Sequence, residues 1–573
     1  MPVPGIDALT ACPVRLQLDL VRPGEPAAPT EAARRRAELA AASRQELLRE
    51  LVDACPEALV IAPDGDDPAA STRAAMRDRV PMVVRPVLYG PTPGATATGP
   101  DVLLVAPDGG YHPLEVVGRT TTSTAAARPM GDDAASARRF ATVDTPWWHA
   151  AGGRQDRVVR RRRNDVLRLA HHRRALAAAG HAAAGNVGAT LGTDRLVTWH
   201  DLAEPSWRPP AHSASAGPHS AMELHEAELD LRRRVAAVAA RHATDPSVPL
   251  LLEPVRTHEC GTCRWRSHCT DRWETSGDVS LLPGSSWSRS LTLQAAGVRT
   301  IDQLARLDPE RPPAALTAGA PALDGEPLPP RAQLVEWVDL ARARLADAPV
   351  LRRRGVERID VHRADVEVDI DLENTDRGVY LWGALVTDRT GTGLATEGYR
   401  SFVSWAEDPA ATEVALFEEF ADWLARLLDH VEACGRTVGV YCFHEQAEAG
   451  AMRRLAAAPD AVPGRAEWVE QLVGSPQWVD LYRVARDHLI TGTSMGLKFL
   501  AGATGFRWDD PDPGGEQSMD WHRAAVGDPS AQVRAAQRDR LLAYNRNDTE
   551  ATLALREAWR HPERLPRVDR LGT

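Results

Sequence analysis

The chain has 573 residues, of which 43% are hydrophobic, and its 79 acidic and 68 basic side chains give a net charge of −11 at pH 7. This length predicts two to four domains with packed cores, and the negative charge excludes binding of nucleic acid through a global basic field. The N-terminal segment shows no basic stretch followed by an apolar run, and no apolar stretch reaches about 18 residues. We therefore expect a soluble, cytoplasmic protein without a membrane partner.

The first stretch, residues 1–276, mixes helical patterns with short strands, among them MVVRPVLYG and DVLLVAPDG. The second of these strands begins at Asp101, and a turn connects it to YHPLEVV, which contains Glu115. Two strands joined by a hairpin, with one carboxylate on each, can hold a divalent metal ion over a phosphodiester. Asp101 and Glu115 are therefore predicted metal ligands.

Three cysteines lie close together in HECGTCRWRSHC, at Cys260, Cys263 and Cys269, and Cys12 stands alone near the N-terminus. The spacing Cys-x2-Cys-x5-Cys allows three thiolates to converge on one metal centre. Cys12 would supply a fourth ligand if the two ends of this segment meet in space. In a reducing compartment such a cluster predicts metal binding rather than a disulfide framework.

Zinc is the alternative to an iron–sulfur cluster at this site, because histidines flank the triplet at positions 258 and 268 and offer nitrogen ligands. The other three cysteines lie far from the triplet along the chain. We predict that they are ordinary buried thiols. They are Cys55, Cys434 and Cys442.

Residues 1–276 resemble the RecB-type PD-(D/E)XK nuclease domain in its iron–sulfur form, through the hairpin acids and the order and spacing of the cysteines. The resemblance implies a restriction-endonuclease-like α/β domain. It also implies that the early cysteine and the later triplet bind a [4Fe–4S] cluster that holds this domain closed. The segment DVLRLAHHRRALAAAG, around Asp165, resembles the helix that follows the catalytic hairpin of the family.

The first stretch departs from this family where the reaction needs a lysine. The family has a lysine two residues after the hairpin glutamate, and here that position is Val117, with no lysine anywhere in the stretch. Arg119 is the nearest cation, but a guanidinium is almost never deprotonated and activates water poorly. Arg168 and His172 stand near the positions of the family's helical Gln and Tyr. These departures predict a retained fold with weakened or lost catalysis.

Residues 277–350 are rich in proline and in helical patterns, which predicts a helical linker. In SLTLQAAGVRTIDQLARL, Leu293 ends one helix and Gly297 makes the turn. Thr300 and Gln303 fit a capping box that opens the next helix. The segment resembles a helix–hairpin–helix element, in which backbone amides at the glycine turn bind a phosphate. Any αα-hairpin would give the same pattern, so DNA contact here is one of two interpretations.

From residue 351 onward strand and helix patterns alternate, which predicts a second α/β domain over 351–573. Its first strong strand, in ADVEVDIDLEN, alternates apolar and acidic residues, so its two faces differ. Four acids on one face repel one another unless a cation or solvent lies among them, and one or two at an edge would face water. The acidic face is predicted to carry Glu367, Asp369, Asp371 and Glu373, and the apolar face Val366, Val368, Ile370 and Leu372.

Further polar residues that could serve in a site follow along this domain. The strand TVGVYCF leads into HEQAEAGAMRRLAA with Glu448, and WVDLYRVARDHL contains Asp480. The segment LLAYNRNDTEATLAL predicts a helix on which Tyr544 and Asp548, four residues apart, share a face. Lys498 is the single lysine of the chain, which favours a need for a compact ammonium rather than for charge alone.

Acids on a first strand together with an acid on a late helix resemble the DEDD exonucleases of the RNase H-like superfamily. The stretch is more closely similar to the YprB-type RNase H-like domain that is often fused behind a RecB-like nuclease. Asp371 and Glu373 match the first motif, Asp-x-Glu, and the pair Tyr544 and Asp548 matches the third, Tyr-x3-Asp. The resemblance covers the chain nearly end to end, and the order of the domains agrees with it.

The same resemblance assigns roles to the remaining residues. Glu448 falls near the second motif, where Asp is commoner, Asp480 is a supporting acid, and Lys498 in TSMGLKFLA lies at a Ser-x-x-Leu-Lys helix start. The implied reaction is two-metal hydrolysis, in which the motif acids hold two Mg2+ or Mn2+ ions about 3.5–4 Å apart. Tyr544 would orient the attacking water. Lys498 would bind a substrate phosphate or steady the acids, or else be a surface cation.

The sequence thus predicts a metal-dependent nuclease, an exonuclease that acts on DNA in repair or recombination. RNA stays an alternative substrate, because no feature reads a 2′-hydroxyl. The competing hypothesis is a nucleic-acid-binding iron–sulfur protein that does not cut and recruits a helicase or repair partner, and a third is a zinc-containing scaffold. Basic runs at residues 157–163 and 352–354 predict solvated faces, with phosphate binding as the lesser interpretation.

Overall fold

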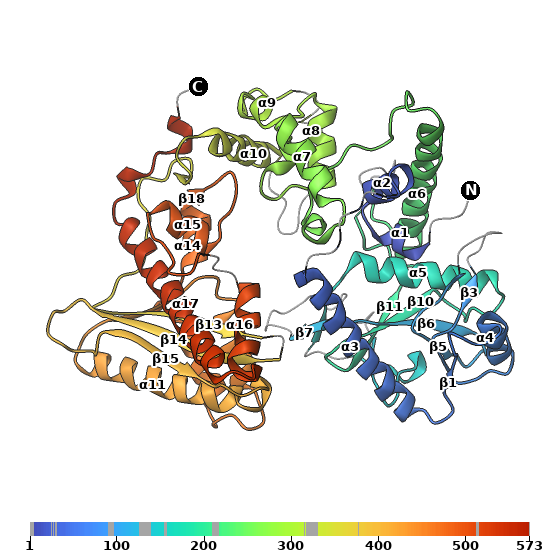
Figure 1. Ribbon diagram of the computed structural model, residues 1–573, viewed down its shortest axis with the longest axis horizontal. Coiled ribbons are helices and arrows are strands. Elements are labelled where there is room, and N and C mark those ends of the chain that lie inside the picture. The colour runs from blue at the N-terminus through green and yellow to red at the C-terminus, as the bar shows by residue number, and fades with distance from the viewer. Residues whose placement is uncertain are drawn as a thin grey trace. The chain divides into compact units, whose positions relative to one another are not determined.

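The computed structural model describes residues 5–24, 26, 28, 31–89, 97–124, 139–153, 157–208, 217–313, 316, 330–375, 377–511 and 515–571. The chain divides into two compact units (Figure 1). The first comprises Met1–Thr275 and Ser286–Leu291, and the second comprises Ser276–Ser285 and Thr292–Thr573. Within the described residues, no helix has the length and apolar character needed to span a membrane.

The core of the first unit is a mixed sheet. In spatial order its described strands are β1 (Leu59–Val60), β2 (Met82–Val84), β5 (Val102–Val105), β6 (Tyr111–Val116), β10 (Val187–Leu191), β11 (Leu196–Asp201) and β8 (Arg139–Thr142). β1 pairs with β2, and β6 with β10, in parallel, and the other neighbours are antiparallel. The predicted hairpin is present as β5 and β6, in which Val102 lies opposite Leu114.

Helices cover both faces of this sheet. On one face α3 (Glu31–Ala54) packs through Leu51 against Leu104 of β5. On the other face α5 (Arg163–Ala178) packs against Leu103, the preceding residue of the same strand. Successive side chains of a strand point to opposite faces, so one apolar strand serves two separate cores. The helix predicted to follow the hairpin is therefore present and lies on the sheet.

Helices from the two ends of the first unit pack together although they lie far apart in the sequence. Figure 1 shows α2 next to α6, and the two are in contact. The bounds of these and the remaining elements are α1 (Ile6–Thr10), α2 (Pro13–Val21), α4 (Pro68–Arg77), α6 (Ala221–Thr244), α7 (Arg266–Ser276), β3 (Leu88–Tyr89), β4 (Ala97–Thr98), β7 (Thr122–Thr124), β9 (Arg157–Val159) and the 3-10 turns η1 (Trp148–Ala150) and η2 (His258–Thr262).

A small helical core opens the second unit. Leu293, near the end of α8 (Trp287–Ala295), packs with α9 (Ile301–Ala305) and with Val338 of α10 (Pro330–Leu345). Most of the segment predicted as a linker therefore clusters with the second unit in this structure. Its independence as a third domain stays a prediction.

The glycine turn between α8 and α9 has the predicted geometry. Gly297 adopts a positive φ of 79°, and Thr300 and Gln303 form the capping box. The amides of Gly297 and Val298 donate to carbonyl groups in the last turn of α8. Internal hydrogen bonds thus use the amides that a phosphate would need, and a DNA contact at this turn stays a prediction.

The second unit is built on a mixed five-stranded sheet. In spatial order its strands are β15 (Gly398–Val403), β14 (Val379–Asp388), β13 (Val366–Asn374), β16 (Val438–Cys442) and β17 (Trp478–Asp480). β13 is central, antiparallel to β14 and parallel to β16. Its apolar residues pack with α11 (Glu413–Ala433), and its acids meet α17 (Ala531–Ala558) on the opposite face (Figure 1). The two faces predicted for this strand are confirmed.

The basic run at residues 352–354 is a solvated face only in part, because Arg352 is buried while Arg354 is exposed. The Arg352 guanidinium donates to the carbonyl of Leu565 at 2.8 Å, and Arg354 forms an ion pair with Asp339 of α10 at 2.7 Å. These contacts fix the run to its own unit, because each cation has an internal partner.

The other elements of the unit are α12 (Glu448–Ala456), α13 (Arg465–Val473), α14 (Leu481–His488), α15 (Leu497–Ala503), α16 (Gly515–Gly527), β12 (Leu351–Arg352), β18 (Leu489–Ile490) and the 3-10 turns η3 (Val279–Leu281), η5 (Pro409–Ala411), η6 (Pro562–Arg564) and η7 (Val568–Arg570).

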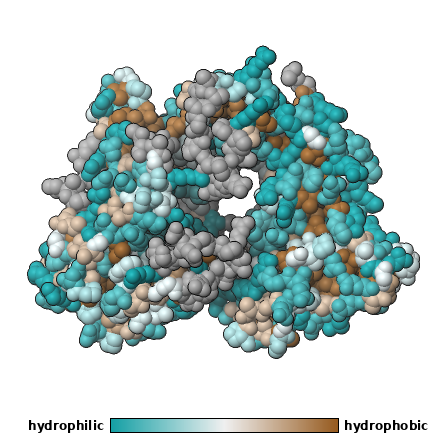
Figure 2. Space-filling model, turned by 180° about the vertical axis from the view of Figure 1, so that it is seen from behind, coloured by the Kyte–Doolittle hydropathy of each residue, from teal (hydrophilic) through white to brown (hydrophobic). Residues whose placement is uncertain are grey.

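Both units combine helices with mixed sheets, so the predicted α/β class is confirmed. Hydrophilic residues predominate on the face shown in Figure 2, with hydrophobic residues scattered among them.

Cys55 and Cys442 are buried as predicted, but Cys434 is exposed, because it follows directly after the last residue of α11. The cores of both units are therefore formed by the apolar faces of strands and helices rather than by any one segment.

Candidate metal centre

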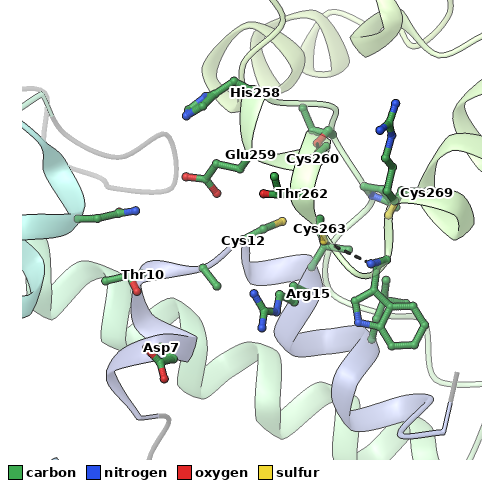
Figure 3. A pocket seen from close by; sticks show the side chains of 18 of the residues that line it. Asp7, Thr10, Cys12, Arg15, His258, Glu259, Cys260, Thr262, Cys263 and Cys269 are labelled. Atoms are coloured by element: carbon green, nitrogen blue, oxygen red, sulfur yellow. Dashed lines mark hydrogen bonds between the residues drawn. The ribbon is translucent and has the colours of Figure 1, made fainter. Parts of the chain in front are cut away.

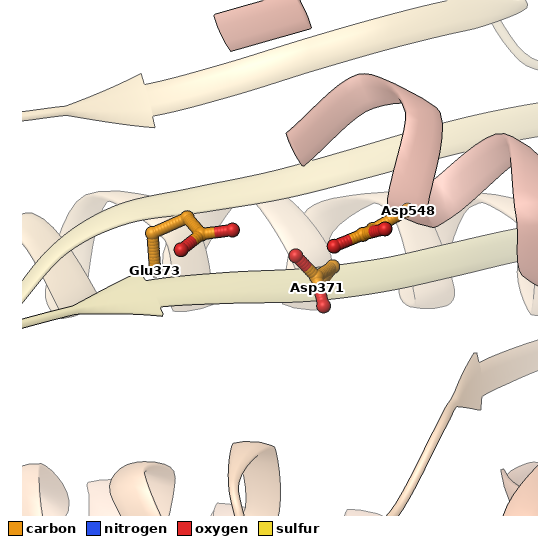
Figure 4. Close-up of side chains that lie close together, drawn as sticks. All are labelled: Asp371, Glu373 and Asp548. Atoms are coloured by element: carbon orange, nitrogen blue, oxygen red, sulfur yellow. The ribbon is translucent and has the colours of Figure 1, made fainter. Parts of the chain in front are cut away.

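Three carboxylates come together in the second unit. Asp371 and Glu373 lie two residues apart on β13 and share a face, and α17 brings Asp548 over that face. One ligand oxygen from each lies within 4.8 Å of the others, and among the described residues this is the one group of three such ligands. Figure 4 shows Asp371 and Asp548 turned toward one another, with Glu373 further along the strand. Hard carboxylate oxygens in this number suit Mg2+ or Mn2+.

The pKa values of this group show an excess of negative charge. Burial, and next the neighbouring Asp548 and Glu373, raise the pKa of Asp371 well above its ordinary value. Burial and Asp548 raise the pKa of Glu373 to about 8. The charge of Lys498 lowers these pKa values but does not outweigh burial and the neighbouring acids. A buried carboxylate group with such an excess of negative charge binds either protons or a cation. The site therefore has the electrostatics of a cation site, and its residues fit a divalent metal ion.

The other two acids of β13 have a different role. Glu367 and Asp369 are fully buried, and Arg556 of α17 forms ion pairs with both, at 2.6 Å to Glu367. Burial alone would raise the pKa of Glu367, but Arg556 and two further arginines outweigh it and lower this pKa. The expectation that one or two of the four acids lie at an edge of the sheet is wrong, because β13 is the central strand. Asp371 is partly exposed all the same.

Glu448 lies on the first turn of α12 and is 3% exposed. Burial raises its pKa to about 8, and among the described residues its Oε2 atom has no hydrogen-bond partner. The charge of Glu448 also contributes to the raised pKa of Asp371. It is therefore close enough to act on the carboxylate group, although its oxygens do not join the set within 4.8 Å.

Asp480 lies outside the carboxylate group. Its side chain caps α14 by accepting a hydrogen bond from the amide of Tyr482 at 3.0 Å, and it accepts a second from the amide of His444 at 2.9 Å. Both amides donate to the same carboxylate oxygen of Asp480, Oδ1. The structure thus places the predicted supporting acid in a helix cap.

Tyr544 and Lys498 flank the carboxylates. The ammonium of Lys498 lies 2.6 Å from the Tyr544 hydroxyl, and this hydroxyl hydrogen-bonds to Asp548. α15 carries the lysine and α17 carries the tyrosine. The single lysine of the chain is therefore held beside the site, one hydrogen bond removed from a carboxylate.

Three neutral donors that the sequence did not single out bind the carboxylates. Asn545 donates to Asp371 at 2.7 Å, and Ser518 donates to Glu373 at 2.9 Å. The indole of Trp508 donates to Asp548 at 2.6 Å. Asn545 stands three residues before Asp548 on a predicted helix, and this spacing could have indicated it. The other two come from segments whose position only packing decides.

The two hairpin acids of the first unit each have a basic side chain next to them. Asp101 accepts hydrogen bonds from Arg44 of α3 at 2.6 Å and from the amide of Val116 at 2.7 Å. Burial, and next the charge of Glu115, raise the pKa of Asp101. His172 of α5 lies 2.9 Å from Glu115. The two predicted metal ligands are thus brought together, each with a basic side chain next to it.

Arg119 and Asp165 complete this part of the first unit. The guanidinium of Arg119 donates to both carboxylate oxygens of Asp165, at 2.5 and 2.7 Å. Arg119, the cation nearest in sequence to the position where the family has its lysine, therefore forms a bidentate ion pair with Asp165 and does not point at a hairpin acid. No third ligand joins Asp101 and Glu115 within 4.8 Å among the described residues.

The four cysteines line one cavity of about 500 Å³ in the first unit. Figure 3 shows Cys12, between α1 and α2, beside the turn that carries Cys260 and Cys263. Burial, and next the other cysteines, raise the pKa of Cys269 to about 12. The two ends of the segment therefore meet, as a shared ligand set requires.

Both metals that the sequence left open stay open at this cavity. No three of the four sulfurs lie within 4.8 Å of one another among the described residues. His258 lines the cavity as well and offers a nitrogen ligand.

Polar contacts hold Cys12 in this place. Arg232 of α6 is 3% exposed and donates to the carbonyls of Ala8 at 3.0 Å and Ala11 at 2.7 Å, directly before Cys12. In α2, Gln17 exchanges two hydrogen bonds with the backbone of Leu252, 235 residues away. The approach of Cys12 to the triplet is thus built into the fold.

Residues 365–560 match the family model of the RNase_H superfamily. The C-terminal domain is RNase H-like. This match covers β13 to β17 and α17, and thus includes all three carboxylates of the candidate metal centre. No curated protein and no solved structure matches the chain. An RNase H-like domain implies a nucleic acid as substrate and a nuclease or related hydrolase as the kind of protein.

Proposed function

We propose that the RNase H-like domain is a metal-dependent exonuclease that hydrolyses phosphodiester bonds in DNA. The observation that carries this proposal is the set Asp371, Glu373 and Asp548. Their oxygens lie within 4.8 Å of one another, and no arginine forms an ion pair with them among the described residues. On the same strand two other acids are neutralised by an arginine. Here the nearby cation is Lys498, so three carboxylates keep an excess of negative charge for metal ions.

Each residue of the site has a separate role in the proposed reaction. Asp371, Glu373 and Asp548 hold Mg2+ or Mn2+, and Glu448 adds negative charge close to Asp371. Bound metal ions supply a deprotonated water and stabilise charge on the leaving oxygen. Tyr544 orients the attacking water from its place beside Asp548. The exonuclease part of the proposal rests on the resemblance of Asp371, Glu373, Tyr544 and Asp548 to the motifs of the DEDD exonucleases.

The test uses single-stranded DNA and RNA labelled at the 5′ or the 3′ end, with Mn2+ present. We expect the wild type to shorten DNA from one end, and Asp371→Asn and Asp548→Asn to abolish this. Asp365→Asn is the control, because Asp365 is not among the proposed site residues and its carboxylate accepts hydrogen bonds from Thr437. Equal degradation by the wild type and by both site variants contradicts the proposed site. If the protein degrades RNA but not DNA, the substrate is RNA and the proposed substrate is wrong.

A second function is favoured by the first unit, whose acids are paired with basic side chains. We propose that this unit is RecB-like in fold, that Cys12, Cys260, Cys263 and Cys269 hold a [4Fe–4S] cluster, and that it binds nucleic acid without cutting. It would then deliver the substrate to the second unit or recruit a helicase or other repair partner. The pairs of Asp101 with Arg44 and of Asp165 with Arg119 support this proposal.

Anaerobic purification separates these alternatives. A brown protein with about four iron atoms per chain is expected, and a colourless protein with one zinc ion contradicts the cluster. Asp101→Asn is expected to leave DNA hydrolysis unchanged within about twofold, since an arginine already binds this acid. Loss of hydrolysis in this variant, with the second-unit site intact, would instead assign cutting to the first unit.

A further inference from the structure

The residues of α17 that face β13 meet its acids one after another. Asn545 donates to Asp371, Thr552 to Asp369, and Arg556 to Asp369 and Glu367. Successive members of this row are seven and four positions apart, so they lie on one face of the helix. The position of each acid along β13 thus decides which residue of α17 it meets.

Asn545 occupies a tight place in this row. It is fully buried, and its Nδ2 atom donates to Asp371 at 2.7 Å while its Oδ1 atom accepts from the hydroxyl of Tyr399 on β15 at 2.7 Å. When Asp371 is ionised, as a cation ligand must be, its carboxylate only accepts hydrogen bonds, and this fixes which end of the amide faces Asp371. Both ends of the amide therefore have a partner, and its orientation is determined.

Gly383 of β14 makes room for this side chain. It lies directly opposite Asp371 across the β13–β14 ladder. A Cβ atom at this position would lie 1.7 Å from Oδ1 of Asn545 and 3.0 Å from the ring of Tyr399. The absence of a side chain at Gly383 is thus a requirement of space.

The choice of donors separates the acids of β13 into two pairs. Arg556 supplies a positive charge to Glu367 and Asp369, and this pair needs no metal ion. Asn545 and Ser518 supply neutral hydrogen bonds to Asp371 and Glu373. A neutral donor fixes the direction of a carboxylate and leaves its negative charge in place. The two acids that bind a cation are therefore those with neutral partners.

We infer that Asn545, held by Tyr399 and given room by Gly383, is a positioning residue that orients Asp371 toward a divalent cation. This inference rests on the proposed function, because it names a residue that prepares the same site. By holding the Oδ2 atom of Asp371, Asn545 leaves the Oδ1 atom for the cation. Residues that orient metal ligands typically change metal affinity by about 10–100-fold when they are removed.

Mn2+ binding to the full chain, followed by electron paramagnetic resonance without nucleic acid, tests this inference. We expect Asn545→Ala to weaken binding by about 10–100-fold, and Tyr399→Phe, which removes a single hydroxyl, by about threefold to tenfold. Asn547→Ala is the matched control. Asn547 is also buried and lies on the same helix, but its amide bonds to Asp509 and Glu550 instead of to the site.

A second measurement separates positioning from a general loss of structure. In the nuclease assay, Asn545→Ala is expected to raise the Mn2+ concentration for half-maximal rate, with most of the rate recovered at saturating Mn2+. Binding by Asn545→Ala and Tyr399→Phe as tight as that of the wild type overturns the inference. Equal weakening in Asn547→Ala also overturns it. If the wild type and Asp371→Asn bind Mn2+ equally, the proposed site fails, and the inference fails with it.

Discussion

Lys498 donates a hydrogen bond to the hydroxyl of Tyr544, with 2.6 Å between Nζ and the oxygen. The ammonium also lies 4.7 Å from the centre of the tyrosine ring. In a chain that otherwise uses arginine for positive charge, a compact ammonium at this point holds a phenol that contacts Asp548. The lysine thus acts on the site through Tyr544.

Lys498→Met is expected to lower the rate of DNA hydrolysis about tenfold to a hundredfold, because the tyrosine loses the contact that places it. Lys498→Arg should restore part of this rate, since a guanidinium can still donate to the hydroxyl. Rates at saturating DNA and Mn2+ are the measurement. A lysine that only contributes surface charge would leave both variants at the wild-type rate.

Arg556→Met is expected to destabilise the second unit by about 3–5 kcal/mol, because it leaves Asp369 buried without its cation and removes one of the three arginines that pair with Glu367. Urea denaturation measures this change. Arg389→Met is the control, since Arg389 also pairs with Glu367 but is partly exposed. Its loss should cost about 0–1 kcal/mol. Similar losses in the two variants would contradict a structural role specific to Arg556.

Mn2+ is expected to bind more tightly as the pH rises. In the metal-free protein burial raises the pKa of Glu373 to about 8, from an ordinary value of 4.5. Between these two pH values the folded state holds more protons than the unfolded state, so the free energy of unfolding falls as pH rises. Mn2+ competes with these protons for the carboxylate.

Thermal denaturation with and without Mn2+, at about pH 6 and about pH 8.5, checks this linkage. The stabilisation by Mn2+ should be larger at the higher pH. Glu373→Gln removes the titrating group and is expected to flatten the pH dependence. If Mn2+ stabilises the wild type equally at both pH values, the predicted pH dependence of Mn2+ binding is contradicted.

Arg232→Met is expected to lower the iron content of the purified protein although it alters no cysteine. The variant loses the hydrogen bonds that fix the carbonyls directly before Cys12. Iron analysis and proteolysis of the N-terminal segment are the measurements. Arg234→Met serves as control, because Arg234 is exposed and pairs with Asp230 on the same helix. Full iron loading in Arg232→Met would show that the cluster alone holds Cys12.

Local periodicity explains what could be predicted from the sequence. A strand repeats every two residues and a helix every 3.6, so Asp371 and Glu373 had to share a face, as did Tyr544 and Asp548. The capping box at Thr300 follows from the same local rules. Each of these predictions depends on residues within one element.

Partners from distant parts of the chain could not be predicted in this way. Arg556 is 189 residues from Glu367, and nothing in the pattern of β13 indicates which of its acids receives a cation. Asp480 shows the same limit, because its place in a helix cap, away from the carboxylate group, depends on where β17 ends and α14 begins.

The sequence by itself determined the α/β class, the two-faced acidic strand, and the faces on which Asp371, Glu373 and Asp548 lie. Only the tertiary structure decided which acids pair with an arginine, which neutral donors bind the others, and that Cys12 reaches the cysteine triplet. The physical reason is that periodicity sets the direction of a side chain within its own element. Packing of elements more than a hundred residues apart decides what that side chain meets.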